Sequence, residues 1–266
     1  MKISVVIPVF NEASTVRTLL QQVWHQTVPS CQKELIIVES NSTDGTREIV
    51  QRFVAEHQNT ASGEITLVLQ EKARGKGSAV RQGLKSATGD IILIQDGDLE
   101  YDVKDYPALV TPILEGKADF VLGSRHLSAG TWKIRKFESN PVRGVLLNFG
   151  GILFHGFFNL LYGTHLSDPT TMFKVFRRSC LQDFDLVSNR FDFDFELVAK
   201  LIRAGYPPIE VPVSYTSRGF SEGKKVSIFR DPLTWVRAIV RFRFAPMRSR
   251  ELAEPMSSAV SAQAKD

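Results

Sequence analysis

The chain has 266 residues, of which 43% are hydrophobic and 23% charged, and its formal net charge is +4. This composition excludes a disordered or fibrous chain, and the length allows one large α/β domain or two small ones. Its two cysteines, Cys31 and Cys180, form no CxxC pair or disulfide framework, which favours a reducing compartment. The five histidines are scattered without metal-ligand spacing, and the chain opens on a strand-like run rather than a signal peptide.

The first hundred residues alternate between strand-like and helix-like segments. Strands are predicted over 3–9, 34–39, 65–69 and 90–95. Helices are predicted from 14 or 15 to 25, from 42–45 to 57, and over 76–86. This alternation indicates βαβ units and a mostly parallel sheet, in which ligands bind beyond the carboxyl ends of the strands. We therefore expect the polar clusters that follow these strands to form one site.

The second half of the chain is less regular. We expect helices over 105–116, 193–204 and 232–244, short strands over 120–123, 172–176 and 209–215, and a polar loop over 128–139. The apolar stretch 145–161 is interrupted by Asn148, His155 and Asn159, so we interpret it as an interfacial or buried helix rather than a membrane span. The small, polar tail from Glu251 is predicted to be disordered.

Basic residues gather between Lys224 and Arg250, where only Asp231 opposes them. Such a local excess indicates an anionic surface or ligand. The basic residues alternate with Phe and Trp, which fits lipid headgroups better than nucleic acid, and no nucleic-acid motif accompanies them.

An acidic run, Asp96, Asp98 and Glu100, directly follows the fourth predicted strand. In an extended segment alternate side chains share a face, so these three carboxylates are expected to converge and to need a neutralising cation. Oxygen ligands suit Mg²⁺ or Mn²⁺, which can bridge a diphosphate. An EF-hand loop is excluded by Tyr101 and Pro107 at two of its required positions, and a solvated acidic loop remains the alternative.

Two further clusters follow strand ends. The segment 74–78 (RGKGS) places glycines and cations at the start of a helix, which suits a phosphate, although it lacks the P-loop pattern and a plain surface turn is the alternative. Asn11, Glu12 and Glu39 could each cap a helix or bind a ribose or base. We favour a cap for Asn11 and a ligand role for Glu39.

Four strings in order, SVVIPVFNE, ELIIVESNSTDGT, RGKGSAVRQGL and GDIILIQDGDLEYD, resemble the nucleotide-binding half of family-2 glycosyltransferases with the GT-A fold. VLGSRH, DPTTMFKVFRR, FDFDFELVAKLIRAGY and EVPVSYTSR are similar to segments of the dolichol- and polyprenyl-phosphate mannose or glucose synthases. The resemblance covers roughly residues 3–245. It implies one GT-A (Rossmann-like) α/β domain over 1–225, divided at about residue 100 into nucleotide-sugar and acceptor halves. A basic, aromatic amphipathic helix (226–247) and a tail (248–266) would follow.

The resemblance also implies roles for individual residues. The nucleotide-sugar donor would be bound by Pro8, Asn11, Glu12, Glu39, Arg74, Lys76 and Asp96. The metal would be held by Asp96, Asp98 and Glu100, the leaving phosphates reached by Arg125, and the acceptor phosphate met by Arg143 and Asn148. Two departures bear on these roles. Glu39-Ser40 stands where the family has paired aspartates, and Leu147 stands where it has a serine after the acceptor arginine.

The implied activity is a metal-dependent, inverting transfer of a hexose from a GDP- or UDP-sugar to a polyprenyl phosphate. Such an enzyme would lie peripherally on the cytoplasmic face of the membrane. A lipid phosphate is already an anion and needs no general base, whereas a hydroxyl acceptor would need one, for which Glu196 and Asp194 are the candidates. Arg218, Lys224 and Lys225 could belong to a loop that closes over the donor. The alternatives are a transferase acting on a saccharide or small-molecule hydroxyl and a non-catalytic nucleotide-binding protein.

Overall fold

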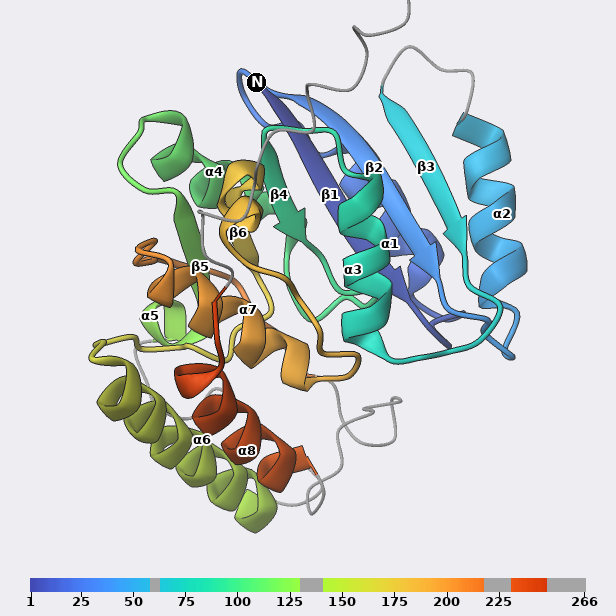
Figure 1. Ribbon diagram of the computed structural model, residues 1–266. Helices are drawn as coiled ribbons and strands as arrows, with labels where there is room; N and C mark the ends of the chain where they lie inside the picture. Colours follow the sequence, from blue (N-terminus) through green and yellow to red (C-terminus); the bar gives the residue numbers. More distant parts are fainter. Residues whose placement is uncertain (58–62, 130–140, 218–230, 248–266) are drawn as a thin grey trace, which may run out of the picture.

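The computed structural model describes residues 1–57, 63–129, 141–217 and 231–247 (Figure 1). The side chains of 129, 141–147 and 231–233 lie outside this description. So do most of the predicted polar loop, the predicted tail, the Arg143 side chain, and Arg218, Lys224 and Lys225.

Seven strands form one sheet in the order β3-β2-β1-β4-β6-β5-β7. They are β1 (Lys2–Val9), β2 (Gln32–Glu39), β3 (Glu64–Leu69), β4 (Ile91–Ile94), β5 (Phe120–Ser124), β6 (Lys174–Arg177) and β7 (Ile209–Pro212). β6 pairs antiparallel with both β4 and β5, and the other pairings are parallel. The predicted mostly parallel α/β fold is therefore confirmed.

Eight helices connect or flank these strands in the described residues. They are α1 (Val16–His25), α2 (Thr46–His57), α3 (Lys76–Ser86), α4 (Tyr106–Leu114), α5 (Arg125–Ala129), α6 (Pro141–Tyr162), α7 (Asp192–Arg203) and α8 (Asp231–Phe244). Two short 3₁₀ turns, η1 (Val103–Asp105) and η2 (Arg178–Asp183), precede α4 and follow β6.

The central strands owe their place to continuous apolar sequence. Ile3, Val5, Val6 and Ile7 of β1 are fully buried, and β1 pairs with β2 on one side and β4 on the other. A strand covered on both faces must be apolar at consecutive positions, because successive side chains point to opposite faces. The unbroken run in the sequence thus specifies an interior strand.

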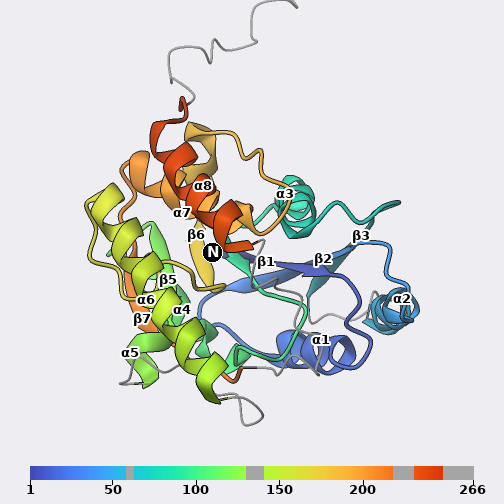
Figure 2. The same ribbon diagram turned by 90° about the horizontal axis from the view of Figure 1, so that it is seen from below.

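Two hydrophobic cores lie on opposite faces of the sheet. One packs α1, α2 and α4 against the sheet, with Leu19, Phe53 and Tyr106 fully buried. The other packs α3 and α7 against it and also includes Phe158 of α6 and Phe242 of α8. Figure 2 shows this layering, with α1 and α2 on one side of the strands and α3, α7 and α8 on the other.

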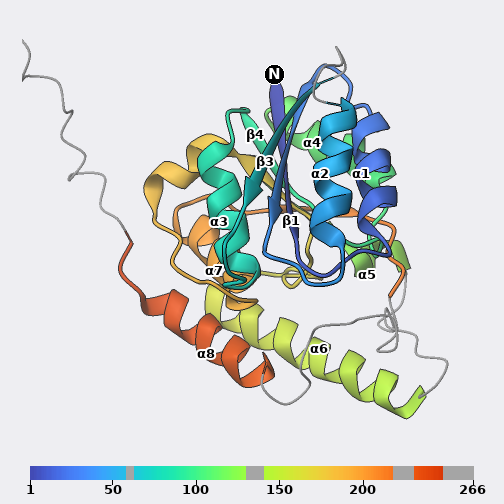
Figure 3. The ribbon, with the colours of Figure 1, turned by 90° about the vertical axis from the view of Figure 1, so that its right-hand side faces the viewer.

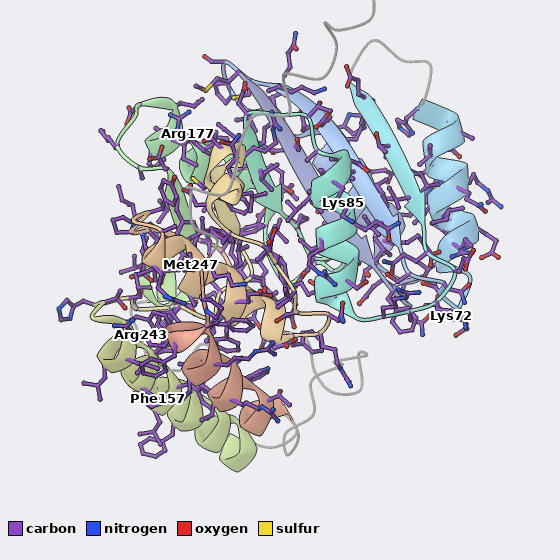
Figure 4. All side chains as sticks on the ribbon, in the orientation of Figure 1. Lys72, Lys85, Phe157, Arg177, Arg243 and Met247 are labelled. Atoms are coloured by element: carbon purple, nitrogen blue, oxygen red, sulfur yellow. The ribbon has the colours of Figure 1, made fainter. Side chains whose placement is uncertain are left out.

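Helices α6 and α8 lie side by side and form an outer layer beyond α7 (Figure 3). Tyr162 donates a hydrogen bond to the Ile239 carbonyl at 2.8 Å, and Arg243 donates to the Leu161 carbonyl at 2.9 Å. Figure 4 shows Arg243 at this contact between the two helices. No helix in the described part of the chain is long and apolar enough to cross a membrane.

Candidate active site

The polar clusters predicted from strand ends meet at one edge of the sheet. β1, β2 and β4 are parallel neighbours, so the segments that follow them leave the sheet on the same side. β5 points the same way, and antiparallel β6 begins there at Lys174. Asn11, Asp96 and Arg125 therefore belong to one edge.

The acidic run after β4 does not continue as a strand. Residues 97–100 form bends, and the Glu100 N–H donates to Asp98 Oδ1 at 3.0 Å. The alternation of faces expected for an extended segment does not hold here. Glu100 instead accepts a hydrogen bond from the Tyr215 hydroxyl at 3.2 Å, while Asp98 is 8% exposed. Asp96 and Asp98 thus remain as a pair, and Glu100 is tied to the segment after β7.

Lys76, the first residue of α3, lies between two carboxylates. Its Nζ is 2.6 Å from Asp96 and 3.7 Å from Asp194, and Asp194 is 2.9 Å from the Nζ of fully buried Lys174. Burial by itself would lower the pKa of Lys76, but the charges of Asp194 and Asp96 raise it above its ordinary value. Burial would likewise raise the pKa of Asp194, but Lys174 and Lys76 lower it. Two ammonium groups and two carboxylates thus alternate in one row.

The glycines of the 74–78 segment bring the chain close to itself. A Cβ on Gly75 would lie 2.6 Å from the Asn189 carbonyl oxygen, and one on Gly77 would lie 2.6 Å from Phe193 Cβ. The Ser78 N–H also donates to the Asn189 carbonyl at 3.0 Å. The start of α3 is therefore covered by 188–193, and the glycines are needed for this packing. Lys76 points to the acidic run, and Arg74 is exposed.

Three of the predicted donor-binding residues shape the loops around the site. Asn11, in the left-handed region at φ 50°, accepts a hydrogen bond from the Thr43 N–H at 2.9 Å. Glu12 is buried and accepts from the Thr15 hydroxyl at 3.1 Å. Glu39 is fully buried and accepts from two backbone N–H groups of the next turn and from Arg47. Its oxygens are thus committed to the β2–α2 turn rather than turned to a ligand.

Pro8 lies near the end of β1, against the turn of the acidic run. A Cβ on Gly97 would stand 3.1 Å from the Pro8 carbonyl oxygen. The Thr15 hydroxyl is 3.4 Å from the Gly97 carbonyl oxygen. The segment after β1 and the acidic run are therefore adjacent, as the strand ends predicted.

Glu196 is not placed to act as a general base. It is fully buried, accepts hydrogen bonds from the Val187 and Ser188 N–H groups, and pairs with Lys200 at 2.5 Å. This corrects the interpretation of Glu196 as catalytic, because a base must reach the substrate proton. Its helix position instead fixes the segment that covers the start of α3. Asp194, two residues earlier, is the member of this pair that reaches the site.

Arg125 begins α5 directly after β5 and is held by a buried carboxylate. Its Nε and one terminal nitrogen each lie 2.7 Å from the two oxygens of Asp168, which is fully buried. Its guanidinium also lies 5.2 Å from the ring centre of Tyr215. This bidentate pair raises the pKa of Arg125 and lowers that of Asp168, in each case against the effect of burial. Arg125 is thus fixed in the acceptor half, on the Tyr215 side that also contacts Glu100.

The structure reveals functional candidates that sequence reasoning missed. Lys174 and Asp168 both lie within the DPTTMFKVFRR string, but nothing local marks them as partners of Asp194 and Arg125. His126 and His155 have no metal-ligand spacing in the sequence, but the fold brings them together beside Asp168. Asn148 of α6 is buried, 5% exposed, and the Arg143 side chain lies outside the described residues.

Asp96 and Asp98 fit a hard divalent cation. Both offer carboxylate oxygens from one tight turn, and Asp96 already holds a cation, the Lys76 ammonium. Glu100 does not join them in a gathered group of three ligands, and the one such group among the described residues is His126, His155 and Asp168. When bound, such an ion would supply positive charge to a leaving diphosphate.

Comparison with known proteins places this geometry in a family. The chain is 28% identical over 225 residues to a dolichol-phosphate mannosyltransferase of Pyrococcus furiosus, covering 84% of this chain and 59% of that one. It is 28% identical to glycosyltransferase AglD of Haloferax volcanii (91% and 38% covered). It is 26% identical to a dolichyl-phosphate beta-glucosyltransferase of Dictyostelium discoideum (91% and 74% covered). The chain thus spans less than two thirds of the length of the two archaeal relatives.

Solved structures show the same fold. Glucosyl-3-phosphoglycerate synthase of Mycobacterium tuberculosis, in complex with Mg²⁺ and uridine diphosphate, superposes with a TM-score of 0.63 at 18% identity. The match covers 92% of this chain and 80% of that one. Residues 4–184 match the family model of glycosyl transferase family 2, and the chain belongs to that family.

Proposed function

We propose that the protein is a metal-dependent, inverting glycosyltransferase that moves a hexose from a GDP- or UDP-sugar to a polyprenyl or dolichyl phosphate. The observation that carries this proposal is the placement of Asp96 and Asp98 at the end of β4, with Lys76 2.6 Å from Asp96. A departing nucleoside diphosphate needs positive charge near its oxygens. The carboxylates can hold a cation that supplies such charge, and the ammonium can pair with the phosphate oxygens. The names of the P. furiosus and D. discoideum relatives supply the acceptor class.

In this proposal the chain's own residues position two large substrates. Pro8 and Glu12 border the nucleoside, and Glu39 holds the neighbouring turn in place. Asp96 and Asp98 would hold the metal ion, which would supply positive charge to the diphosphate. Lys76 pairs with the diphosphate oxygens, and Asp194 and Lys174 keep its ammonium near the site. Arg125 reaches the leaving phosphates, and Arg143 and Asn148 meet the acceptor phosphate. The reaction is one in-line displacement at the anomeric carbon.

Burial of Glu196 favours an acceptor that needs no base. A hydroxyl acceptor must lose a proton, and Glu196 is enclosed by Lys200 and backbone N–H groups. Asp194 is the other candidate, but its lowered pKa makes it a weak base. A phosphate acceptor is already an anion. A saccharide or small-molecule hydroxyl remains the second candidate, and Asp194 would then have to accept the proton.

The donor half of the proposal is tested by Asp98→Asn. The variant should lose the Mn²⁺-dependent thermal stabilisation that UDP- or GDP-sugar gives the wild-type protein, because the amide removes the anionic ligand. Asp102→Asn is the matched control, since Asp102 only caps η1 and Asn caps equally well. Retained Mn²⁺-dependent donor binding in Asp98→Asn would discredit the metal assignment. The nucleotide that stabilises more identifies the base.

We also propose that the protein lies on the cytoplasmic face of the membrane, with α6 and α8 on anionic lipid. Phe149, Leu153 and Leu160 are 55%, 58% and 84% exposed and recur along one side of α6. Exposed Val236, Val240 and Phe244 form a similar stripe on α8, beside the exposed arginines 237 and 241. Apolar side chains flanked by cations suit the interface of an anionic bilayer.

Co-sedimentation with vesicles rich in phosphatidylserine tests this surface. The wild-type protein should bind at low salt, and the double variant Leu153→Ser/Leu160→Ser should bind less. Val187→Ser, which alters an apolar side chain of similar exposure (47%) on another segment, is the control. Equal sedimentation of the double variant and the wild type would remove α6 from the proposal.

The acceptor is tested by incubation with polyprenyl phosphate and a panel of labelled nucleotide sugars. Label in the organic phase supports the lipid phosphate. Transfer only to a soluble saccharide would favour a hydroxyl acceptor, with Asp194 as the base.

A further inference from the structure

Two histidines and an aspartate gather on the acceptor side of the sheet, beside Arg125. His126 comes from α5, His155 from α6, and Asp168 from the segment that leads into β6. One ligand atom of each lies within 4.8 Å of the others. Among the residues described, no second group of three His, Cys, Asp or Glu side chains is gathered as closely. The three segments are far apart in sequence, so only the fold brings them together.

The carboxylate of this group is held rigidly. The backbone N–H of Asp168 and that of Ser167 both donate to the carboxylate of Glu210 on β7, at 2.8 and 2.7 Å. The side chain of Asp168 is fixed from the other side by the bidentate contact with Arg125. A carboxylate oriented by a neighbouring hydrogen-bond donor is the usual arrangement around protein metal ligands. Both oxygens of Asp168 accept from Arg125, so a bound ion would share this carboxylate with the guanidinium.

The histidines stand at distances that suit a small ion after a minor adjustment. The two imidazole rings are perpendicular, with centres 5.3 Å apart. His155 Nε2 lies 3.9 Å from Asp168 Oδ1 and 3.1 Å from the Thr170 hydroxyl. Ligands on a tetrahedral ion with bonds of about 2.0–2.1 Å stand roughly 3.3 Å apart. The distance between His155 Nε2 and Asp168 Oδ1 would have to shorten by about 0.6 Å to reach this separation.

The donor set indicates which ion would bind. Two imidazole nitrogens and one carboxylate oxygen favour Zn²⁺ and its neighbours in the first transition row, whereas Mg²⁺ and Mn²⁺ favour the all-oxygen pair Asp96 and Asp98. Three protein ligands leave one position for water or an anionic oxygen. We propose that His126, His155 and Asp168 form a second, Zn²⁺-type metal site that ties α5 and α6 to the segment before β6. This site does not depend on the proposed transferase activity.

The test uses the full chain after treatment with a chelator and dialysis, and Co²⁺ as the probe. Co²⁺ bound to a tetrahedral site with nitrogen ligands gives strong visible absorption, which Zn²⁺ should abolish by displacement and Mn²⁺ should not. We expect one such site per chain. His126→Asn and His155→Asn should each weaken Co²⁺ binding by more than about tenfold, since even loss of a residue that only orients a ligand costs 10–100-fold.

Two controls separate this site from others. His165→Asn alters an exposed histidine in the segment after α6, outside the cluster, and should keep the absorption. Asp98→Asn should also keep it, so failure of the donor-metal assignment and failure of this site give different results. Circular dichroism checks that each variant is folded. Unchanged Co²⁺ binding in the folded double variant His126→Asn/His155→Asn, or no displaceable absorption in the folded wild-type protein, would overturn the proposal.

Discussion

Replacing Glu196 by Gln changes a buried carboxylate into a neutral amide of the same shape. The carboxylate accepts hydrogen bonds from Val187 and Ser188 N–H groups at 2.9 and 2.7 Å, and from Lys200 at 2.5 Å. In the variant the amide oxygen can keep part of these bonds, but the amide NH₂ now faces a donor. Lys200 loses its counter-charge and keeps the Asp185 carbonyl, at 2.5 Å, and the Phe242 ring, whose centre is 5.2 Å away.

The loss of stability should be large. Removing one partner of a buried ion pair costs about 3–5 kcal/mol, and because Lys200 retains a carbonyl acceptor we expect about 3 kcal/mol. For a domain of this size that corresponds to a melting temperature lower by roughly 6–12 °C. The protein should still fold, because domains are stable by about 5–15 kcal/mol.

Activity should change much less than stability. We expect kcat in Glu196→Gln, assayed as release of nucleoside diphosphate below the melting temperature, to stay within about tenfold of wild type. Lys200→Met should give a similar loss of stability and a similar kcat, since it breaks the same pair. A general base contributes about 10²–10⁴-fold. A kcat reduced by that factor in a variant of unchanged stability would refute the structural role of Glu196.

Two further predictions concern stability. Burial alone would raise the pKa of Glu34, but hydrogen bonds, led by that of the Lys2 ammonium, lower it to about 2. The resulting stabilisation of about 3 kcal/mol is present above pH 4.5 and is lost as the pH falls toward 2. Urea unfolding should show that the free energy of unfolding falls less steeply with decreasing pH in Glu34→Gln than in the wild type. Gly77→Ala places a Cβ 2.6 Å from Phe193 Cβ and should cost about 1–3 kcal/mol in the same assay. Gly156→Ala, with open space at its Cβ and a helical backbone, should leave stability unchanged or raise it by about 0.5–1 kcal/mol. Equal effects of the two alanines would contradict the close packing at α3.

The sequence predicted the donor half of the molecule well because its signals are local. An apolar run such as Ile3–Val9 can only be a strand covered on both faces, and the helix predicted over 76–86 is observed as Lys76–Ser86. Since the strands are parallel, the residues after each strand share an edge. The grouping of Glu12, Asp96 and Lys76 therefore follows from strand order and spacing alone.

Tertiary structure decided which carboxylates face the site. Glu100 follows Asp96 and Asp98 in sequence, but a bend and the Tyr215 hydroxyl turn it elsewhere. The sequence makes Glu196 a candidate general base, yet burial and the pair with Lys200 make it structural. A periodic pattern predicts which side chains share a face only while the segment stays regular. Where the backbone is irregular or charges pair across the fold, the periodic pattern no longer predicts which way a side chain points.

The acceptor half depended most on the fold. Arg125 and Asp168 are 43 residues apart, and His126 and His155 come from different helices. No local sequence spacing predicts these contacts, because the contacting residues lie on segments that are far apart in the sequence. The sequence thus predicted the parallel sheet and its carboxyl edge, but it predicted an extended segment where residues 97–100 bend. Only the packing of α5, α6 and β6 decided that two scattered histidines stand beside a buried aspartate, since contacts between distant segments are set by the core that each helix covers.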